Sequence, residues 1–162
     1  AGADLGIRNA GYRAIESLRL EKGYRAWSSD LSPDHTPLEA GLAWAVKLNC
    51  ETDFLGRAAL LQQQGQGLKK QLACFTADDN NVNLIGRETL YRNEQRVGWL
   101  TSAGYGHTVD CPIGFGYVRN PDGIDQDYLE RGDYSLEVAG VRVPCTIHFK
   151  PLYDPAMSRV RN

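Results

Sequence analysis

Residues 88–100 read ETLYRNEQRVGWL, and this stretch is the most informative part of the chain about its fold. Two short runs rich in apolar and β-forming side chains, 88–92 and 95–100, flank the polar dipeptide Asn93-Glu94. Two such runs separated by a two-residue turn are typical of a β-hairpin. The sequence therefore predicts a pair of antiparallel strands here.

The same pattern continues on both sides of this hairpin. Strand-like runs occupy residues 72–76 and 112–118, and two more, 134–138 and 141–147, surround the tight turn Ala139-Gly140. Repeated short strands joined by turns are typical of a small closed barrel or a sandwich. We predict one antiparallel barrel of about six strands over residues 68–150. The side chains expected to face inward or into an interface are those of Trp99, Phe115, Tyr117, Leu136 and Val143.

The first part of the chain follows a helical rather than a β pattern. Asn9 is predicted to cap a helix over residues 10–21, in which apolar and charged side chains alternate with helical spacing. Gly23 is a plausible end of that helix. Residues 28–37 contain two prolines and several small polar residues, which predicts a loop.

Three further elements complete this segment. The apolar run 42–48 has the length of a strand, a second helix is predicted over 56–64, and the polar tract 62–67 (QQQGQG) is predicted to be a linker. A single strand has no sheet to join here, so we expect this segment to be the tail of a larger domain that begins upstream. Its apolar face needs the missing upstream part or the barrel to cover it. We expect part of this face to be buried against the barrel or a second copy of the chain, through Trp27, Leu42 and Trp44.

Length, charge and hydropathy exclude several classes of protein. The 162 residues include 18 Lys and Arg against 20 Asp and Glu, which gives a net charge of −2. A nucleic-acid-binding domain would usually be basic, so we predict no nucleic-acid partner. No apolar run approaches the roughly 18 to 20 residues of a membrane span, and the N-terminus lacks the features of a signal peptide. We predict no membrane insertion.

The four cysteines indicate a reducing compartment. Cys50, Cys74, Cys111 and Cys145 are widely spaced and form no C-x-x-C pair. We favour free thiols over a disulfide framework. This predicts a cytoplasmic protein, or one of the mitochondrial matrix if the source is eukaryotic.

Metal binding and nucleophilic catalysis have little support in the sequence. The loop with Asp30, Asp34, His35 and Glu39 matches no known ligand spacing, so we predict no metal site. No G-x-S-x-G motif occurs, and no glycine-rich segment opens a helix as a nucleotide-binding loop does. Arg19 and Glu21 flank an apolar residue near the predicted helix end, where an arginine can bind a carboxylate. The spacing alone favours the alternatives, an internal ion pair or a charge on the helix face.

Three ordered blocks carry a resemblance to a known family. They are residues 10–25 (AGYRAIESLRLEKGYR), 36–42 (TPLEAGL) and 53–57 (DFLGR). In this order and spacing they resemble the glycine-cleavage T-protein family, or aminomethyltransferases. Within this family, the chain is most similar to the sarcosine dehydrogenase and dimethylglycine dehydrogenase (oxidase) branch. This similarity lies in residues 21–25, 74–76 and 131–134 and in the final Tyr-Asp-Pro at 153–155.

The resemblance implies an α+β fold in two parts. Residues 1–66 would be the C-terminal remnant of a folate-binding α+β domain, and residues 67–162 a small antiparallel β-barrel. It also implies transfer of a one-carbon unit from an N-methyl or aminomethyl amine to tetrahydrofolate. FAD would belong only to an upstream domain that this sequence lacks.

The resemblance further implies a partial site. Arg19 would contact the glutamate tail of folate, Glu21 would orient Arg19, and a further contact is expected near Ser158 or Arg159. The family's catalytic Asp and pterin-binding Glu lie upstream, so we expect no catalytic residue in this chain. We expect the chain to be inactive alone, to need the upstream part of its own polypeptide, and to be prone to self-association. The alternatives are a non-catalytic regulatory or interaction subunit of the same fold, and a barrel module without a ligand.

Overall fold

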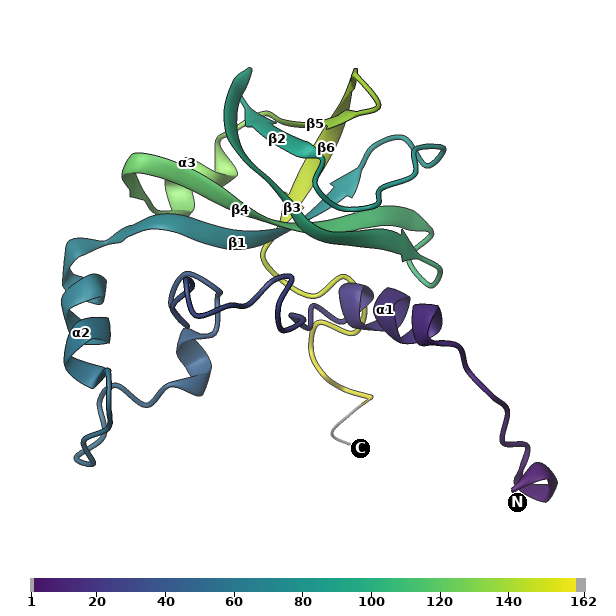
Figure 1. Cartoon of the computed structure of the whole chain (residues 1–162), viewed down its shortest axis with the longest axis horizontal. Helices are drawn as coiled ribbons and strands as arrows, with labels where there is room; N and C mark the ends of the chain where they lie inside the picture. Colours follow the sequence, from purple (N-terminus) through teal and green to yellow (C-terminus); the bar gives the residue numbers. More distant parts are fainter. Residues whose placement is uncertain (1, 160–162) are drawn as a thin grey trace.

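The computed structural model describes residues 2–159, whose centre is a closed antiparallel barrel (Figure 1). The strands follow one another around the barrel in the order β1-β4-β3-β2-β5-β6, and β6 pairs with β1 to close it. The predicted barrel of six strands is confirmed. Its strands are β1 (Leu68–Ala77), β2 (Thr89–Arg92), β3 (Gln95–Gly106), β4 (Cys111–Ile124), β5 (Tyr134–Val138) and β6 (Val141–His148).

Two tight turns set the register of the barrel. Asn93 and Glu94 have φ angles of 47° and 64°, and Ala139 and Gly140 have 49° and 82°. Positive φ at both central residues is the conformation whose twist matches that of paired strands. The strands pair directly beside each turn, Arg92 with Gln95 and Val138 with Val141. Both predicted hairpins are confirmed.

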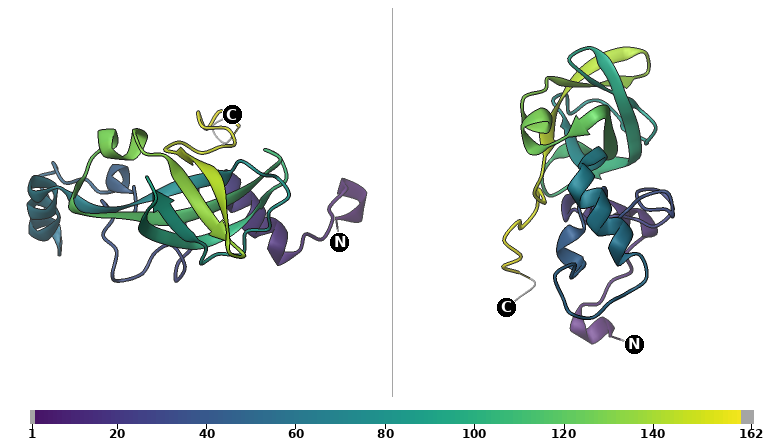
Figure 2. Two further views of the ribbon diagram at one scale, coloured as in Figure 1. Left: turned by 90° about the horizontal axis from the view of Figure 1, so that it is seen from above. Right: turned by 90° about the vertical axis from the view of Figure 1, so that its left-hand side faces the viewer.

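The remaining elements lie outside the barrel. Figures 1 and 2 show α1 lying along the barrel and α2 standing apart, next to the start of β1. Helix α1 contacts β3 and β4. None of the helices within residues 2–159 is long and apolar enough to cross a membrane. These elements are the 3₁₀ turns Ala3–Leu5 and Ala43–Ala45 and the helices α1 (Tyr12–Glu21), α2 (Arg57–Gln66) and α3 (Gln126–Glu130).

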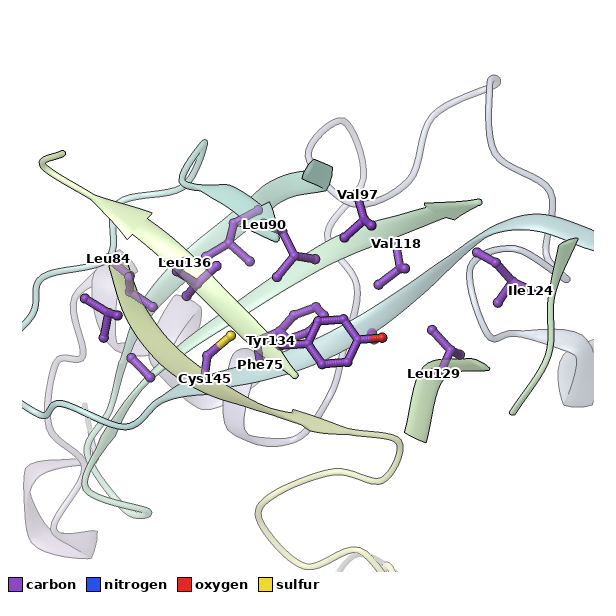
Figure 3. Packing of buried hydrophobic residues seen from close by; sticks show 14 residues of the cluster. Phe75, Leu84, Leu90, Val97, Val118, Ile124, Leu129, Tyr134, Leu136 and Cys145 are labelled. Atoms are coloured by element: carbon purple, nitrogen blue, oxygen red, sulfur yellow. The ribbon is translucent and has the colours of Figure 1, made fainter. Parts of the chain in front are cut away.

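Residues 72–75 of strand β1 are buried on both faces, which explains why this part of the strand is a continuous apolar run. Ala73 and Phe75 point into the barrel core, whereas Leu72 and Cys74 point outward into a second cluster. The barrel core also contains Leu90, Leu100, Val118, Leu129, Tyr134, Leu136 and Val143 (Figure 3). The second cluster, which we call the seam cluster, consists of Leu20, Leu72, Cys74, Ile113, Phe115 and Tyr117.

We use "seam" for the region where α1, residues 24–41 and residues 149–159 pack on the outer faces of β1, β3 and β4. Leu20 of α1 is 1% exposed and belongs to the seam cluster. The backbone N–H of Leu72 donates to the carbonyl oxygen of Glu39, at 2.8 Å, so the loop also pairs with β1. Phe115 and Tyr117 are therefore interface residues, whereas Leu136 and Val143 point inward, as predicted.

Three predictions about local structure are wrong. Helix α1 begins after Gly11, whose backbone is extended, and not after Asn9. Residues 42–48 form no strand, because the N–H groups of Ala45, Val46 and Leu48 bond to carbonyls two or three residues earlier instead of to a neighbouring strand. The predicted linker 62–67 is mostly helical, since α2 runs to Gln66 and glutamine is a good helix former.

The first segment packs on the barrel as predicted, through Leu20, but the side chains predicted to make this contact do not make it within the chain. Trp27 and Trp44 are 70% and 82% exposed, and Leu42 is half-buried. Their burial by a second copy of the chain stays a prediction. Trp99 is half-buried on the outer face of β3, beneath the guanidinium of Arg119, 4.1 Å from the ring centroid.

Candidate functional site

A cavity of about 450 Å³ lies between α1 and the C-terminal segment, and we call it the α1 cavity. Arg19, Glu21 and Arg159, which the sequence singled out, all line it. They come from positions 140 residues apart in the chain, and the fold brings them together. The remaining lining residues are Ile15, Leu18, Lys22, Tyr24, Thr108, Tyr153 and Asp154.

The helical repeat of α1 forms one wall of this cavity. Leu18, Arg19 and the C-cap residue Lys22 lie three, four and seven residues after Ile15, which places them on one helix face. Ile15 and Leu18 are 57% and 60% exposed. Leu20 points the other way, into the seam cluster. The cavity therefore combines an apolar wall with charged groups at its edges.

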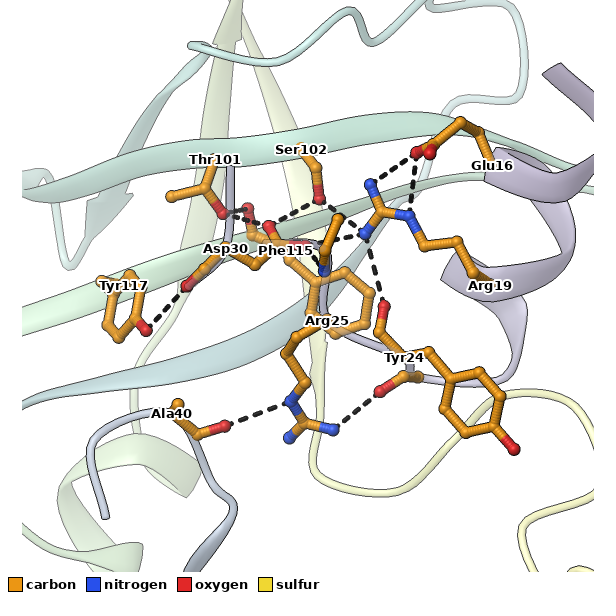
Figure 4. Close-up of polar contacts among 12 residues, drawn as sticks. Glu16, Arg19, Tyr24, Arg25, Asp30, Ala40, Thr101, Ser102, Phe115 and Tyr117 are labelled. Atoms are coloured by element: carbon orange, nitrogen blue, oxygen red, sulfur yellow. Dashed lines mark hydrogen bonds and ion pairs between the residues drawn. The ribbon is translucent and has the colours of Figure 1, made fainter. Parts of the chain in front are cut away.

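Arg19 is held by a network of hydrogen bonds (Figure 4). Its Nη1 donates to Asp30 Oδ2 at 2.7 Å and to Ser102 Oγ at 3.0 Å. Its Nε and Nη2 both donate to Glu16 Oε2, at 2.9 and 2.8 Å. The arginine thereby joins α1 to the loop and to β3, and its Nη2 edge, shared with half-exposed Glu16, lies nearest to solvent.

Asp30 is the buried centre of this network. Its side chain is fully buried, and Oδ1 accepts hydrogen bonds from Thr101 Oγ1 and Ser102 Oγ at 2.6 and 2.7 Å. The hydroxyl of Tyr117 donates to its backbone carbonyl at 2.9 Å. Burial, followed by the charge of Asp30, raises the pKa of Tyr117, so the phenol stays protonated and remains a donor. A buried carboxylate is tolerated because it is paired and hydrogen-bonded on both oxygens.

Glu21 does not contact Arg19, so the predicted pairing of these two side chains is wrong. Residues two apart on a helix point in different directions. Glu21 is 1% exposed, and its Oε1 accepts from the backbone N–H groups of Thr108 and Val109, at 2.5 and 3.4 Å. Its Oε2 is buried without a hydrogen-bond partner among the residues that the structure describes. Glu21 therefore attaches α1 to the turn between β3 and β4.

The C-terminal segment closes the α1 cavity through a second ion pair. Lys22 Nζ donates to Asp154 Oδ2 at 2.9 Å and to the Asp154 carbonyl at 2.8 Å. Hydrogen bonds from Lys22 and Ser158 hold the pKa of Asp154 far below its usual value. The guanidinium of Arg159 lies 5.7 Å from the centroid of the Tyr153 ring, on the cavity wall.

Three of the four residues considered as metal ligands have other roles. Asp30 belongs to the Arg19 network, and Glu39 forms a reciprocal cap with Thr36, accepting from its N–H at 2.9 Å. His35 stacks on Tyr117 with 4.1 Å between the ring centroids. Within residues 2–159 no three His, Cys, Asp or Glu side chains gather in a way that would hold a metal ion.

The four cysteines are free thiols, as predicted. Burial raises the pKa of Cys74 and of Cys145 to about 12. A thiol with so high a pKa is protonated at neutral pH and is a poor nucleophile. These two cysteines therefore serve as core residues.

Sequence reasoning missed Asp30, Ser102 and the Lys22–Asp154 pair as parts of the site. Asp30 lies 11 residues from Arg19, across a loop whose path no periodicity specifies. Ser102 and Asp154 are 83 and 132 residues from their partners. The sequence offered only an acid in the loop that follows the helix carrying Arg19.

Two family descriptions match this chain. The glycine cleavage T-protein C-terminal barrel domain matches residues 70–154, and the GCVT N-terminal domain matches residues 1–50. The chain is also similar to the aminomethyltransferase T of Bartonella henselae, with a TM-score of 0.82 and 27% identity over 95% of this chain and 42% of that one.

Curated relatives agree with this assignment. The chain is 47% identical to the mitochondrial sarcosine dehydrogenase of Homo sapiens and 42% identical to its mitochondrial dimethylglycine dehydrogenase, in both cases over 99% of this chain. It is 40% identical, over 93% of its length, to the mitochondrial pyruvate dehydrogenase phosphatase regulatory subunit of Mus musculus. The chain spans only 18% of each of these proteins. With its barrel, its ordered sequence blocks and these matches, the chain belongs to the glycine cleavage T-protein family.

Proposed function

We propose that the α1 cavity is this chain's part of a tetrahydrofolate site, in an enzyme that moves a one-carbon unit from an N-methyl or aminomethyl amine to tetrahydrofolate. The observation that carries the proposal is the meeting of Arg19, Glu21 and Arg159 at one cavity. Tetrahydrofolate would supply the nitrogen atoms that accept the one-carbon unit. The chain would supply cations for the carboxylates of the folate tail and an apolar wall for its less polar part.

The residues present suit such a ligand. Arginine pairs with carboxylates through two parallel N–H donors, and Arg19 presents the Nη2 edge toward the exposed side of its network. Arg159 is exposed, and no carboxylate within the described residues pairs with its guanidinium. Ile15 and Leu18 offer exposed apolar surface beside both cations. This combination fits an elongated anion with an apolar section.

Glu16 is the internal competitor for such a ligand. Its carboxylate takes up Arg19 Nε and Nη2, which are the donors that a folate carboxylate would need. Asp30 and Ser102 hold Nη1 from the buried side and would keep the guanidinium in place. We therefore propose that the folate tail displaces Glu16 and leaves the Asp30 pair intact.

We propose that the chain acts as part of a longer polypeptide and has no catalysis of its own. This is supported by the small share of its relatives that it spans and by the absence of a catalytic constellation among the described residues of the α1 cavity. We propose residues 1–66 as the end of the folate-binding domain and residues 67–162 as the barrel domain. FAD would bind to an upstream domain. The names of the relatives describe mitochondrial proteins, and we propose the mitochondrial matrix as its location in a eukaryote.

A second candidate function is regulation without catalysis. It is supported by the 40% identity to the pyruvate dehydrogenase phosphatase regulatory subunit. The two candidates differ in whether folate binding is retained when the chain is joined to its upstream region. A protein that binds no tetrahydrofolate in that form would favour the regulatory candidate.

The test removes the charge of Glu16 and measures the affinity for tetrahydrofolate. In the protein that joins this chain to its upstream region, Glu16→Gln should tighten tetrahydrofolate binding by about two- to fivefold, since charged surface pairs of this kind are worth up to about 1 kcal/mol. Isothermal titration calorimetry measures the affinity. Glu51→Gln, an exposed acid of the same segment, is the matched control and should change nothing.

Two results would count against the proposal. One is equal affinity of the Glu16→Gln variant and the unmodified protein. The other is tight binding of tetrahydrofolate by the 162-residue chain alone, which would show that the site needs no upstream residues. We expect the isolated chain to bind weakly or not at all.

A further inference from the structure

A second cavity, separate from the α1 cavity, lies on the other side of the Asp30 network. It has a volume of about 320 Å³ and is enclosed by the loop of residues 28–35 and the outer faces of β1, β3 and β4. We call it the outer cavity. Three cations from separate parts of the chain line it, Lys70, Arg87 and Arg119, against one carboxylate, that of Asp34. Its lining is therefore net positive.

Two of these cations lack an anionic partner within the described residues. Arg119 donates one hydrogen bond, from Nη1 to the carbonyl of Tyr117 at 3.2 Å, and the guanidinium of Arg87 makes neither a hydrogen bond nor an ion pair. Lys70 is better satisfied, since it donates to the Asp34 carbonyl at 2.7 Å and lies 3.5 Å from Glu39. Arg119 is half-buried, and burial without a counterion is unfavourable for a cation and lowers the pKa of Arg119.

Arg119 is nevertheless fixed in place. Its guanidinium lies over the ring of Trp99, 4.1 Å from the centroid, so the planar group is oriented before any ligand arrives. Arg87 is held by its backbone, whose φ of 78° is rarely adopted by a residue with a long side chain. Its N–H donates to the Leu100 carbonyl at 2.8 Å, which ties it to β3 at the cavity.

His35 adds a third unsatisfied group to the same cavity. Its Nδ1 is buried and has no hydrogen-bond partner among the described residues. Burial and then the charge of Lys70 lower the pKa of His35, while Glu39 and Asp34 oppose this, so the imidazole is neutral at pH 7. An unpartnered buried polar atom calls for an explanation, and a ligand in the cavity supplies one.

We propose that the outer cavity binds a phosphate-type oxyanion, held by Lys70, Arg87 and Arg119. The cations approach from β1, from the loop before β2 and from β4. Donors arriving from three directions suit a tetrahedral dianion with several acceptor oxygens, whereas a planar carboxylate is satisfied by one arginine. Neither the folate proposal nor its residues in the α1 cavity are needed for this inference.

Trp99 allows the site to be observed directly. The chain contains three tryptophans, and Trp27→Phe with Trp44→Phe leaves Trp99 alone, at little structural risk because both side chains are exposed. The emission of this variant is titrated with inorganic phosphate at constant ionic strength set with sodium chloride. We expect a saturable change in Trp99 emission, and a parallel shift of the His35 imidazole resonance that the exposed His107 does not show.

Matched variants then assign the response. Arg87→Gln should weaken phosphate binding about tenfold or more, the loss expected for one charge-assisted hydrogen bond. Arg87 is exposed, so this substitution leaves the core unchanged. Arg131→Gln, which removes the same charge from a residue of which 77% of the side chain is exposed, should bind phosphate as the unmodified chain does.

Titrations with other anions identify the ligand and can overturn the inference. Equal affinity for inorganic phosphate and glycerol 3-phosphate would support recognition of the oxyanion alone, and tighter binding of the ester would support a small phosphorylated metabolite. Succinate binding more tightly than phosphate would overturn the choice of oxyanion. The proposal as a whole is wrong if phosphate and chloride give the same response, or if Arg87→Gln and Arg131→Gln bind equally.

Discussion

The barrel and the seam are held together by different forces. The barrel core is apolar apart from the hydroxyl of Tyr134, and its sheet is closed, so its stability comes from hydrophobic burial and from strand pairing all the way around the barrel. The seam has its own apolar cluster, but around it lie the Arg19–Asp30 and Lys22–Asp154 ion pairs and the Glu21 contact with the β3–β4 turn. Both cavities with unsatisfied polar groups border the seam.

This difference indicates that the barrel and the seam have different roles. A closed barrel leaves no unpaired strand edge and tolerates little change, so it serves as a rigid support. The seam positions charged side chains by means of other charged side chains, and each of these can be altered without reaching the core. We therefore expect damage to the barrel to unfold the whole chain, and damage to the seam to release only the first segment.

The largest effect is expected from the barrel core. Phe75 is fully buried there, and Phe75→Ala should lower the free energy of unfolding by about 3–5 kcal/mol, because it removes apolar contacts and leaves a cavity. Urea denaturation measures the loss, and hydrogen exchange should show faster exchange in every strand. Phe149→Ala, at a side chain that is 43% exposed, is the control and should cost much less.

A smaller and more local effect is expected at Asp30. Asp30→Ala leaves the Arg19 cation without its buried partner, which costs about 3 kcal/mol in comparable pairs. Faster hydrogen exchange should be confined to α1 and residues 26–31, with the barrel still protected. Asp34→Ala, an exposed acid of the same loop, should change stability by less than about 0.5 kcal/mol. Uniform loss of protection in the Asp30 variant would contradict the separation of barrel and seam.

The smallest structural effect is expected at the C-terminal segment, and it depends on pH. Hydrogen bonds from Lys22 and Ser158 lower the pKa of Asp154, so its contribution is complete above the ordinary carboxyl pKa and is lost only as the pH falls through the lower, folded value. The segment should therefore stay docked at pH 4. Resistance of residues 150–159 to proteolysis measures this.

Asp154→Asn provides the comparison for that experiment. The variant should release the segment at neutral pH and should show no further dependence on acid. Release of the unmodified segment between pH 5 and pH 4 would contradict the sign of the shift.

Most of the barrel could be predicted from the sequence, because its strands and two-residue turns are local patterns. The turns at Asn93-Glu94 and Ala139-Gly140 are both present with the expected backbone. The first segment was harder. An apolar run such as 42–48 resembles a strand, yet whether it forms one depends on a neighbour that local sequence does not reveal. The tract 62–67, predicted to be a linker, is helical as far as Gln66, because glutamine favours a helix.

The site could be predicted in its members but not in its contacts. Resemblance to the family pointed to Arg19, Glu21 and Arg159, and they do share a cavity. The predicted partner of Arg19, Glu21, is wrong. The contact of Arg19 with Asp30 depends on the path of a loop, and its contact with Ser102 depends on the register of the barrel strands. The outer cavity could not be predicted from any sequence motif, because its three cations come from separate elements.

The most direct test of the functional account is the affinity for tetrahydrofolate of the protein that joins this chain to its upstream region, measured with and without Arg159→Gln. Arg159 is exposed and its guanidinium is engaged only with the Tyr153 ring among the described residues, so its loss should not affect folding. We expect binding to weaken about tenfold or more, while the Arg131→Gln control is unchanged. Equal affinity of all three proteins would contradict the assignment of the α1 cavity as a folate site.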